Sequence, residues 1–268
     1  RLQDAFHTSL KTSDTSCLTV MAGVSGTGKS AFPKMYAESM GFYFLPLAVE
    51  PRWDSPQDLF GFLNYMENRF ESTTLARSLI QFNDAPHSNE NANLKDNLLI
   101  VMLDEMNLAR IEYYFSEFLS KLELRRDTNL SDIKDYRTVS TEIFAGNDGD
   151  KEKGIEKTDP IFLYAGYNVL FVGTMNEDET TQSLSDKVID RANVLTFGKP
   201  ENLTISKGNV RIDRHGKLKK PKETKTNQQN EWEPMLEKNW RGWICEPGGD
   251  TIKNDFKEVE GLLNDLNN

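Results

Sequence analysis

The sequence contains little of what several common protein classes require. Only two of its 268 residues are cysteines, Cys17 and Cys245, and they lie far apart, which argues against a disulfide framework or a zinc cluster. No apolar run approaches the roughly 18 residues of a membrane-spanning helix, and the first residues lack the apolar centre and cleavage site of a signal peptide. We therefore expect a cytoplasmic protein that keeps reduced thiols and makes no contact with a membrane.

Basic residues are outnumbered as well. The chain has 32 Lys and Arg against 42 Asp and Glu, which gives a net charge of -10. This balance argues against the chain as a whole binding nucleic acid through its phosphates, so any contact with DNA has to be local. A basic run extends from Lys207 to Lys225. Such a run is more typical of a solvated loop than of a DNA contact.

The residues that are present describe a globular α/β domain. Hydrophobic residues make up 37% of the chain, including 15 Phe and 8 Tyr, which is enough for a packed core. Apolar runs typical of buried strands alternate with segments of helical periodicity or composition. Strands are predicted at 17–22, 42–49, 98–103, 167–175 and 193–197, and helices at 29–40, 67–82, 109–124 and 180–192. This alternation predicts a mostly parallel central sheet flanked by helices.

The flanking regions differ in composition from this core, which we place at residues 17–200. Residues 1–16 are polar and weakly helical, and we interpret them as a lead-in segment. Residues 131–160 are charged and contain glycine, which predicts an inserted hairpin or loop. Residues 201–268 are predicted to form a polar basic loop and the start of an incomplete C-terminal helical region. Because the chain begins at Arg1 and stops within a predicted helix, we expect a fragment of a longer polypeptide.

A glycine-rich segment, GVSGTGKS, follows the first predicted strand and precedes the first helix. It comprises Gly23, Val24, Ser25, Gly26, Thr27, Gly28, Lys29 and Ser30. Its spacing is that of a phosphate-binding loop, in which backbone N–H groups surround phosphate oxygens. Lys29 would neutralise the outer phosphates, and the Ser30 hydroxyl would bind Mg²⁺. The strand before the loop and the helix after it favour this interpretation over a chance glycine-rich turn.

A second candidate element is the acidic pair Asp104 and Glu105, which ends the apolar run LLIVML. Carboxylates at the C-terminal end of a buried strand lie at the sheet edge where ligands bind in open α/β folds. We expect Asp104 to hold Mg²⁺ through water and Glu105 to orient or deprotonate an attacking water. The alternative is a strand that simply meets a solvated helix. The separation of about 75 residues from Lys29 predicts two strands of one sheet that are not adjacent.

Two further polar residues follow later in the chain. Asn176 ends the stretch GTMN, where it could hydrogen-bond the attacking water or the γ-phosphate; an Asn that caps the following turn fits the spacing equally well. Arg191 lies at the end of the last predicted helix. It could pair with Asp190 or a neighbouring Glu, or it could reach a nucleotide bound to an adjacent subunit.

Together these stretches resemble the McrB-type branch of the AAA+ NTPases, the motor subunits of modification-dependent restriction systems, with MoxR and dynein-like ATPases as more distant relatives. The resemblance covers about residues 17–200 and rests on GVSGTGKS, VMLDEMNLARIEYYFSEFLSKLE and NVLFVGTMNEDETTQSLSDKVIDRANVLTF, in this order. It implies a Walker A loop at Gly23 to Ser30, a Walker B pair at Asp104 and Glu105, Asn107 in a DEIN-type motif, Asn176 as first sensor and Arg191 as arginine finger. It also implies Mg²⁺-dependent hydrolysis of ATP or GTP in a ring, expected to be a hexamer, with a nuclease partner and with DNA bound by other parts of the protein.

The chain departs from the McrB pattern at informative points. Where that family has MNTADR, this chain has MNEDET at 175–180, so the preference for GTP does not carry over. A helical lid with a second sensor Arg is also not recognisable. The alternatives are a nucleotide-dependent scaffold without hydrolysis, a MoxR-like remodelling chaperone and a small-molecule kinase. Against a kinase, Asp104 and Glu105 together with Asn176 suit water as the phosphate acceptor.

Overall fold

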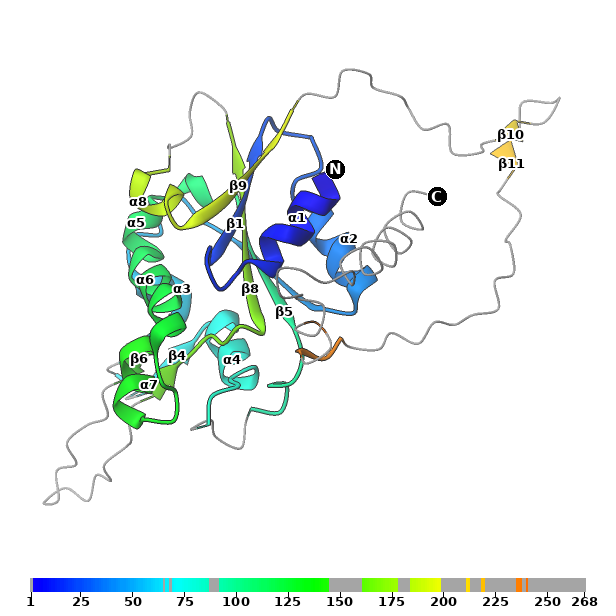
Figure 1. Cartoon of the computed structure of the whole chain (residues 1–268). Helices are drawn as coiled ribbons and strands as arrows, with labels where there is room; N and C mark the ends of the chain where they lie inside the picture. Colours follow the sequence, from blue (N-terminus) through cyan, green and yellow to red (C-terminus); the bar gives the residue numbers. More distant parts are fainter. Residues whose placement is uncertain are drawn as a thin grey trace, which may run out of the picture.

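The computed structural model describes residues 2–64, 66–67, 69–86, 92–144, 161–177, 184–198, 211–212, 218–219, 235–237 and 240. Its centre is a five-stranded parallel sheet with the strand order β2-β5-β8-β1-β9 (Figure 1). The strands are β1 Leu18–Gly23, β2 Tyr43–Ala48, β5 Leu99–Asp104, β8 Val169–Asn176 and β9 Ala192–Phe197. The α/β fold with a mostly parallel sheet, predicted from the sequence, is confirmed.

Helices cover both faces of this sheet (Figure 1). On one face lie α1 Leu2–Lys11 and α2 Ala31–Met40. On the other lie α3 Pro56–Phe60, α4 Thr74–Gln81, α5 Ile111–Tyr114, α6 Ser116–Leu124 and α8 Asp186–Ile189. The continuous apolar run of β5 follows from this layering, because Ile100 packs in the first layer while Val101 and Leu103 pack in the second.

The connections between strands create a topological switch point between β1 and β8. The chain leaves β1 through α2 on one face to reach β2 at the sheet edge, whereas it leaves β8 through α8 on the other face and passes β1 to reach β9. The two neighbouring strands β1 and β8 therefore send their connections in opposite directions. In open parallel sheets, ligands bind beyond the C-terminal ends of the strands at such a point.

Smaller elements extend the core. β3 Gly61–Asn64 and β4 Arg69–Ser72 form an antiparallel hairpin, and β6 Thr141–Phe144 pairs antiparallel with β7 Ile161–Leu163. The remaining elements are α7 Ile133–Val139, the short turns η1 Met106–Leu108 and η2 Arg125–Asp127, and the two-residue strands β10 Arg211–Ile212 and β11 Leu218–Lys219. Of the predicted insertion at 131–160, residues 145–160 lie outside the described residues.

Three predicted helices differ from the observed ones. The helix predicted at 67–82 was wrong in its first half, because residues 69–72 form β4 against β3 and only 74–81 are helical. The helix predicted at 109–124 is interrupted at Phe115, whose φ of -123° is not helical, and so divides into α5 and α6. Within the last helix, predicted at 180–192, the described residues are helical only at 186–189, and β9 begins at Ala192.

The N-terminal segment and part of the C-terminal region lie against each other. Phe6 and Leu10 of α1 are buried, so residues 1–16 contribute to the core. Trp240 is also buried, its ring packs edge-on against Phe42, and its carbonyl oxygen accepts a 2.6 Å hydrogen bond from Lys11 Nζ. Most of the basic run at 207–225 lies outside the described residues. Of the helices described, none is long and apolar enough to cross a bilayer.

Candidate active site

The glycine-rich loop lies at the C-terminal end of β1 and leads directly into α2. Gly26 and Gly28 have φ angles of 78° and 84°, which L-residues with a side chain rarely adopt. Gly23, at φ 151°, is restricted further because a Cβ there would collide with the carbonyl oxygen of Phe197 on β9. These glycines allow the loop to turn tightly against the sheet, as a loop that surrounds phosphate with backbone N–H groups requires.

Lys29 lies within this loop and is only 5% exposed. Its Nζ donates hydrogen bonds to the carbonyl oxygens of Gly23 at 2.9 Å and of Val24 at 2.6 Å. Thr27 closes the same turn, since its hydroxyl donates to the Val24 carbonyl at 2.9 Å. The loop therefore holds a buried ammonium group whose present acceptors are neutral carbonyls, and a phosphate oxygen would be a stronger acceptor than either.

Ser30 joins the loop to the acidic pair on β5. The Ser30 hydroxyl donates to Asp104 Oδ1 at 2.7 Å, although the two residues are 74 positions apart in the sequence. β8 separates β1 from β5, so the prediction of two non-adjacent strands in one sheet is confirmed. A hydroxyl and a carboxylate are oxygen ligands of the kind Mg²⁺ takes together with water and substrate phosphates. No group of three or more His, Cys, Asp and Glu suited to a metal occurs in the described part of the chain. The donor set thus fits Mg²⁺ held partly by phosphate.

Glu105 occupies an unusual backbone conformation next to Asp104. Its φ and ψ are 53° and 45°, and it is the one non-glycine residue with a positive φ in the described ranges. A left-handed non-glycine residue is uncommon, and its cost is met by surrounding contacts. Tyr114 supports the turn that follows, because its hydroxyl donates to the Met106 carbonyl at 2.8 Å; burial raises the pKa of Tyr114, so this donor stays protonated.

Asn176 approaches Glu105 from the neighbouring strand. It lies opposite Gly23 in the register of β1 and β8, and its Nδ2 donates to Glu105 Oε1 at 3.0 Å. Asn107, which is buried, donates in turn to the Asn176 carbonyl oxygen at 2.9 Å. The structure therefore brings the glycine-rich loop, the acidic pair, Asn107 and Asn176 together at the C-terminal edge of the sheet.

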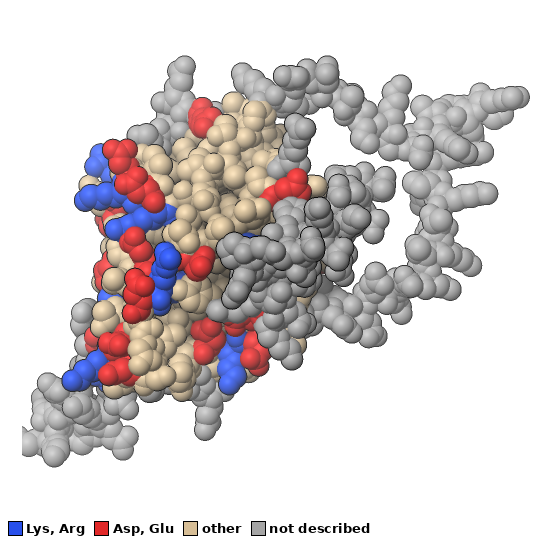
Figure 2. Space-filling model, in the orientation of Figure 1, with Lys and Arg blue, Asp and Glu red and all other residues tan. Residues whose placement is uncertain are grey.

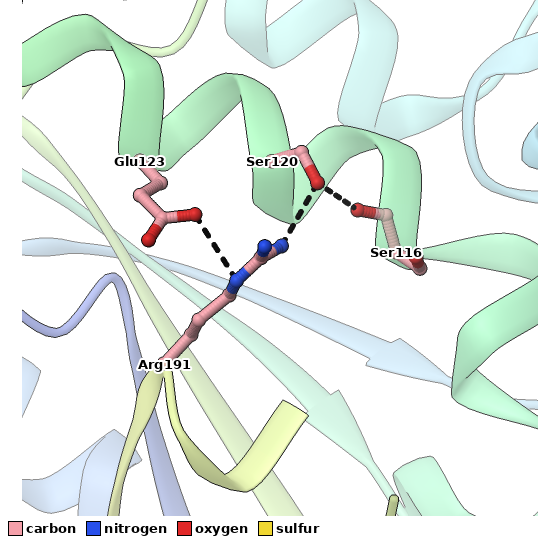
Figure 3. Close-up of polar contacts among 4 residues, drawn as sticks. All are labelled: Ser116, Ser120, Glu123 and Arg191. Carbon is pink, nitrogen blue, oxygen red and sulfur yellow. Dashed lines mark hydrogen bonds and ion pairs between the residues drawn. The ribbon is translucent and has the colours of Figure 1, made fainter. Parts of the chain in front are cut away.

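Arg191 is the sequence-predicted site residue that lies elsewhere. Its Nε forms an ion pair with Glu123 Oε2 at 3.0 Å, and its Nη1 donates to Ser120 Oγ at 2.9 Å, both on α6 (Figure 3). Arg191 immediately precedes β9, whose first residue lies opposite Leu18, whereas the loop begins opposite Phe197 at the other end of β9. A six-residue strand places these ends about 17 Å apart. Of the alternatives left open by the sequence, the single chain shows pairing with a neighbouring Glu.

The sequence interpretation gave no role to Thr174. Thr174 is 1% exposed, and its hydroxyl contacts both members of the acidic pair. A signal was available, because Thr174 precedes Asn176 by two residues and the same face of a strand recurs with period two. The pairing of Arg191 with Glu123 had no comparable signal, since the two residues belong to elements far apart in the sequence.

Comparisons with known proteins add little to this geometry. No protein-family model matches the sequence, and no curated protein matches it. The chain is similar to a solved structure from Cytophaga hutchinsonii ATCC 33406, named as a candidate ATPase, with 18% sequence identity and a TM-score of 0.39. The similar region covers 72% of this chain and 45% of that protein, so the chain spans less than half of its length. At this identity and score the similarity is too weak to assign a function.

Proposed function

We propose that this chain is a nucleotide-hydrolysing domain of the AAA+ type, which acts on ATP or GTP with Mg²⁺. One observation carries the proposal. The hydrogen bond between Ser30 and Asp104 joins a phosphate-binding loop on β1 to a carboxylate on β5, and Glu105 lies beside it, held by Asn176. Loop, metal-binding oxygens and a base therefore share one sheet edge, as hydrolysis of a bound triphosphate requires.

Each residue has a distinct role in this proposal. The loop N–H groups and Lys29 bind the phosphates, and Ser30 and Asp104 would hold Mg²⁺, which when bound neutralises charge on the phosphate oxygens. Glu105 accepts the proton of the attacking water, and Asn176 orients the Glu105 carboxylate through their 3.0 Å hydrogen bond. Asn107 positions Asn176 in turn.

The location of Arg191 supports an assembly in which subunits complete each other's sites. Because Arg191 lies at the opposite end of β9 from its own loop, its guanidinium can stabilise a transferring phosphoryl group only on another subunit. We propose a ring, a hexamer by resemblance, that works in a McrB-like restriction or phage-defence system with a nuclease partner. A MoxR-like remodelling chaperone is the second candidate, since the same site would serve it.

DNA contacts are proposed for other parts of the protein. Figure 2 shows acidic and basic side chains interspersed on the described part of one face, over α5, α6 and α8. A mixed surface of this kind does not favour phosphate binding, which needs clustered Lys and Arg.

Loss of the Lys29 ammonium tests the nucleotide site. Lys29→Ala should abolish binding of Mg-ATP and Mg-GTP in calorimetry, because the phosphates lose the one cation that the loop supplies. Lys34→Ala is the matched control, since Lys34 lies on α2, is exposed and pairs only loosely with Glu38 at 3.9 Å. Parental affinity in the Lys29 variant would remove the basis of the proposal.

A further inference from the structure

We infer that Thr174 is a positioning residue that sets both carboxylates of the acidic pair for hydrolysis. This inference rests on the proposed function, and it assigns to the site a second residue of β8 besides Asn176. Thr174 lies on β8, between the strand that carries the loop and the strand that carries the acidic pair. Thr174 therefore lies between the glycine-rich loop on one side and the acidic pair on the other.

One hydroxyl group makes both contacts. Thr174 Oγ1 donates to Asp104 Oδ1 at 2.6 Å and accepts from the Glu105 backbone N–H at 2.9 Å. A hydroxyl offers one donor and two acceptor lone pairs on a single atom, so the same oxygen can serve both partners. A valine at this position would have the same shape but neither function.

The contact with Glu105 acts on its backbone. Glu105 adopts a left-handed conformation that is costly for a residue with a side chain, and such conformations persist where neighbouring groups determine them. The Thr174 hydroxyl supplies one of these determinants by accepting the Glu105 N–H. Thr174 precedes Asn176 by two residues, and Asn176 donates to the Glu105 side chain, so one short segment of β8 contacts both the backbone and the carboxylate of Glu105.

The contact with Asp104 acts on its side chain. Asp104 Oδ1 accepts from two hydroxyls, Ser30 on one side at 2.7 Å and Thr174 on the other at 2.6 Å. Thr174 itself is buried and its bond to Asp104 is partly buried, whereas the bond from the Ser30 hydroxyl is exposed. Thr174 therefore holds the orientation of Asp104 independently of Ser30, which has to turn toward a metal and phosphates.

Three substitutions test this inference on the intact protein. Thr174→Val removes the hydroxyl at nearly constant shape, and kcat should fall on the order of tenfold to a hundredfold, because the acidic pair loses the hydrogen bonds that orient it for hydrolysis. Thr174→Ser keeps the hydroxyl and should retain the parental kcat. Thr19→Val is the matched control, because Thr19 is 2% exposed on the adjacent strand β1 and its hydroxyl donates to Ser9 Oγ at 3.1 Å, outside the site. Its kcat should remain parental.

Calorimetry with and without Mg²⁺ measures how much the metal increases nucleotide affinity, a quantity that would not change if Thr174 served only in packing. Thr174→Val should bind metal-free ATP or GTP like the parent, since the loop and Lys29 are untouched, but Mg²⁺ should increase its affinity less than it does for the parent. If Thr174→Val does not fold, Thr174→Cys takes its place, and a thiol as a weak donor and acceptor should give an intermediate loss of kcat.

The outcomes separate this inference from the proposed function. A parental kcat in Thr174→Val or Thr174→Cys, or an equal loss in Thr174→Ser or Thr19→Val, overturns the role of Thr174 while the parent still hydrolyses nucleotide. If the parent itself releases no phosphate, the proposed function fails first, whatever the variants do.

Discussion

Replacement of Arg191 distinguishes a ring motor from a self-contained switch. The Arg191 side chain is held by Ser120 and Glu123 on α6, at the opposite end of β9 from the loop of its own subunit. Since about 17 Å of strand separates the two ends, Arg191→Ala should leave nucleotide affinity unchanged. Hydrolysis should nevertheless be lost if the guanidinium acts on a neighbouring subunit.

The expected magnitudes of the two effects differ widely. The Arg191 and Glu123 side chains are 34% and 52% exposed, and ion pairs of this kind contribute about 0–1 kcal/mol to stability. The free energy of unfolding should therefore fall by less than about 1 kcal/mol, with a Tm shift of at most roughly 2–4 °C. An arginine finger supplied in trans contributes on the order of a thousandfold or more to the rate. A small loss of stability beside a large loss of rate is the expected signature.

Phosphate release measures the rate, and Glu123→Gln is the matched control. That variant breaks the same ion pair but keeps the guanidinium, so it should hydrolyse nucleotide at close to the parental rate. Arg191→Ala mixed with Lys29→Ala should recover activity, because one subunit keeps an intact loop and its neighbour an intact Arg191. Equal rate losses in Arg191→Ala and Glu123→Gln, or no recovery at any ratio in assemblies confirmed as mixed by mass, would refute action in trans and leave a local ion pair.

Two further changes test the loop and the basic run. Gly23→Ala should lower the free energy of unfolding by about 1–3 kcal/mol in thermal denaturation and weaken nucleotide binding, because its Cβ collides with the Phe197 carbonyl. Gly198→Ala is the control, since a Cβ at Gly198 meets open space. Equal Tm values for the two variants would contradict this prediction. Replacement of Lys217, Lys220, Lys222 and Lys225 by Ala should leave the salt dependence of DNA binding unchanged, as for a solvated loop. A slope flattened by about 0.9 per lost phosphate contact would instead show that this run binds DNA.

Local sequence patterns predicted those site residues whose conformation or position is determined by their neighbours in the chain. The loop glycines are set by the backbone angles of one turn, and Asp104 and Glu105 are marked by the end of a single apolar run. The strand order was not predictable in this way. That β8 lies between β1 and β5 depends on pairings between residues about 70 or more positions apart, and it is this order that puts Asn176 beside Glu105.

The errors have the same physical origin. The segment 69–72 has a composition compatible with a helix, yet it pairs with Gly61–Asn64, where Gly61 lacks the Cβ that would collide with the Glu71 carbonyl. A partner strand therefore overrides local preference. The pairing of Glu123 with Arg191 could not be predicted for a related reason, because it joins elements that are distant in sequence.

Phosphate release by the intact protein beside its Glu105→Gln variant tests the central claim most directly. Gln keeps the Oε1 that accepts from Asn176 Nδ2, so the variant should bind nucleotide like the parent, but an amide cannot take the proton of water. The parent should release phosphate from Mg-ATP or Mg-GTP, and the variant should be slower by about two to four orders of magnitude. No release from either nucleotide by the parent, or an equal rate in the variant, would contradict hydrolysis at this site.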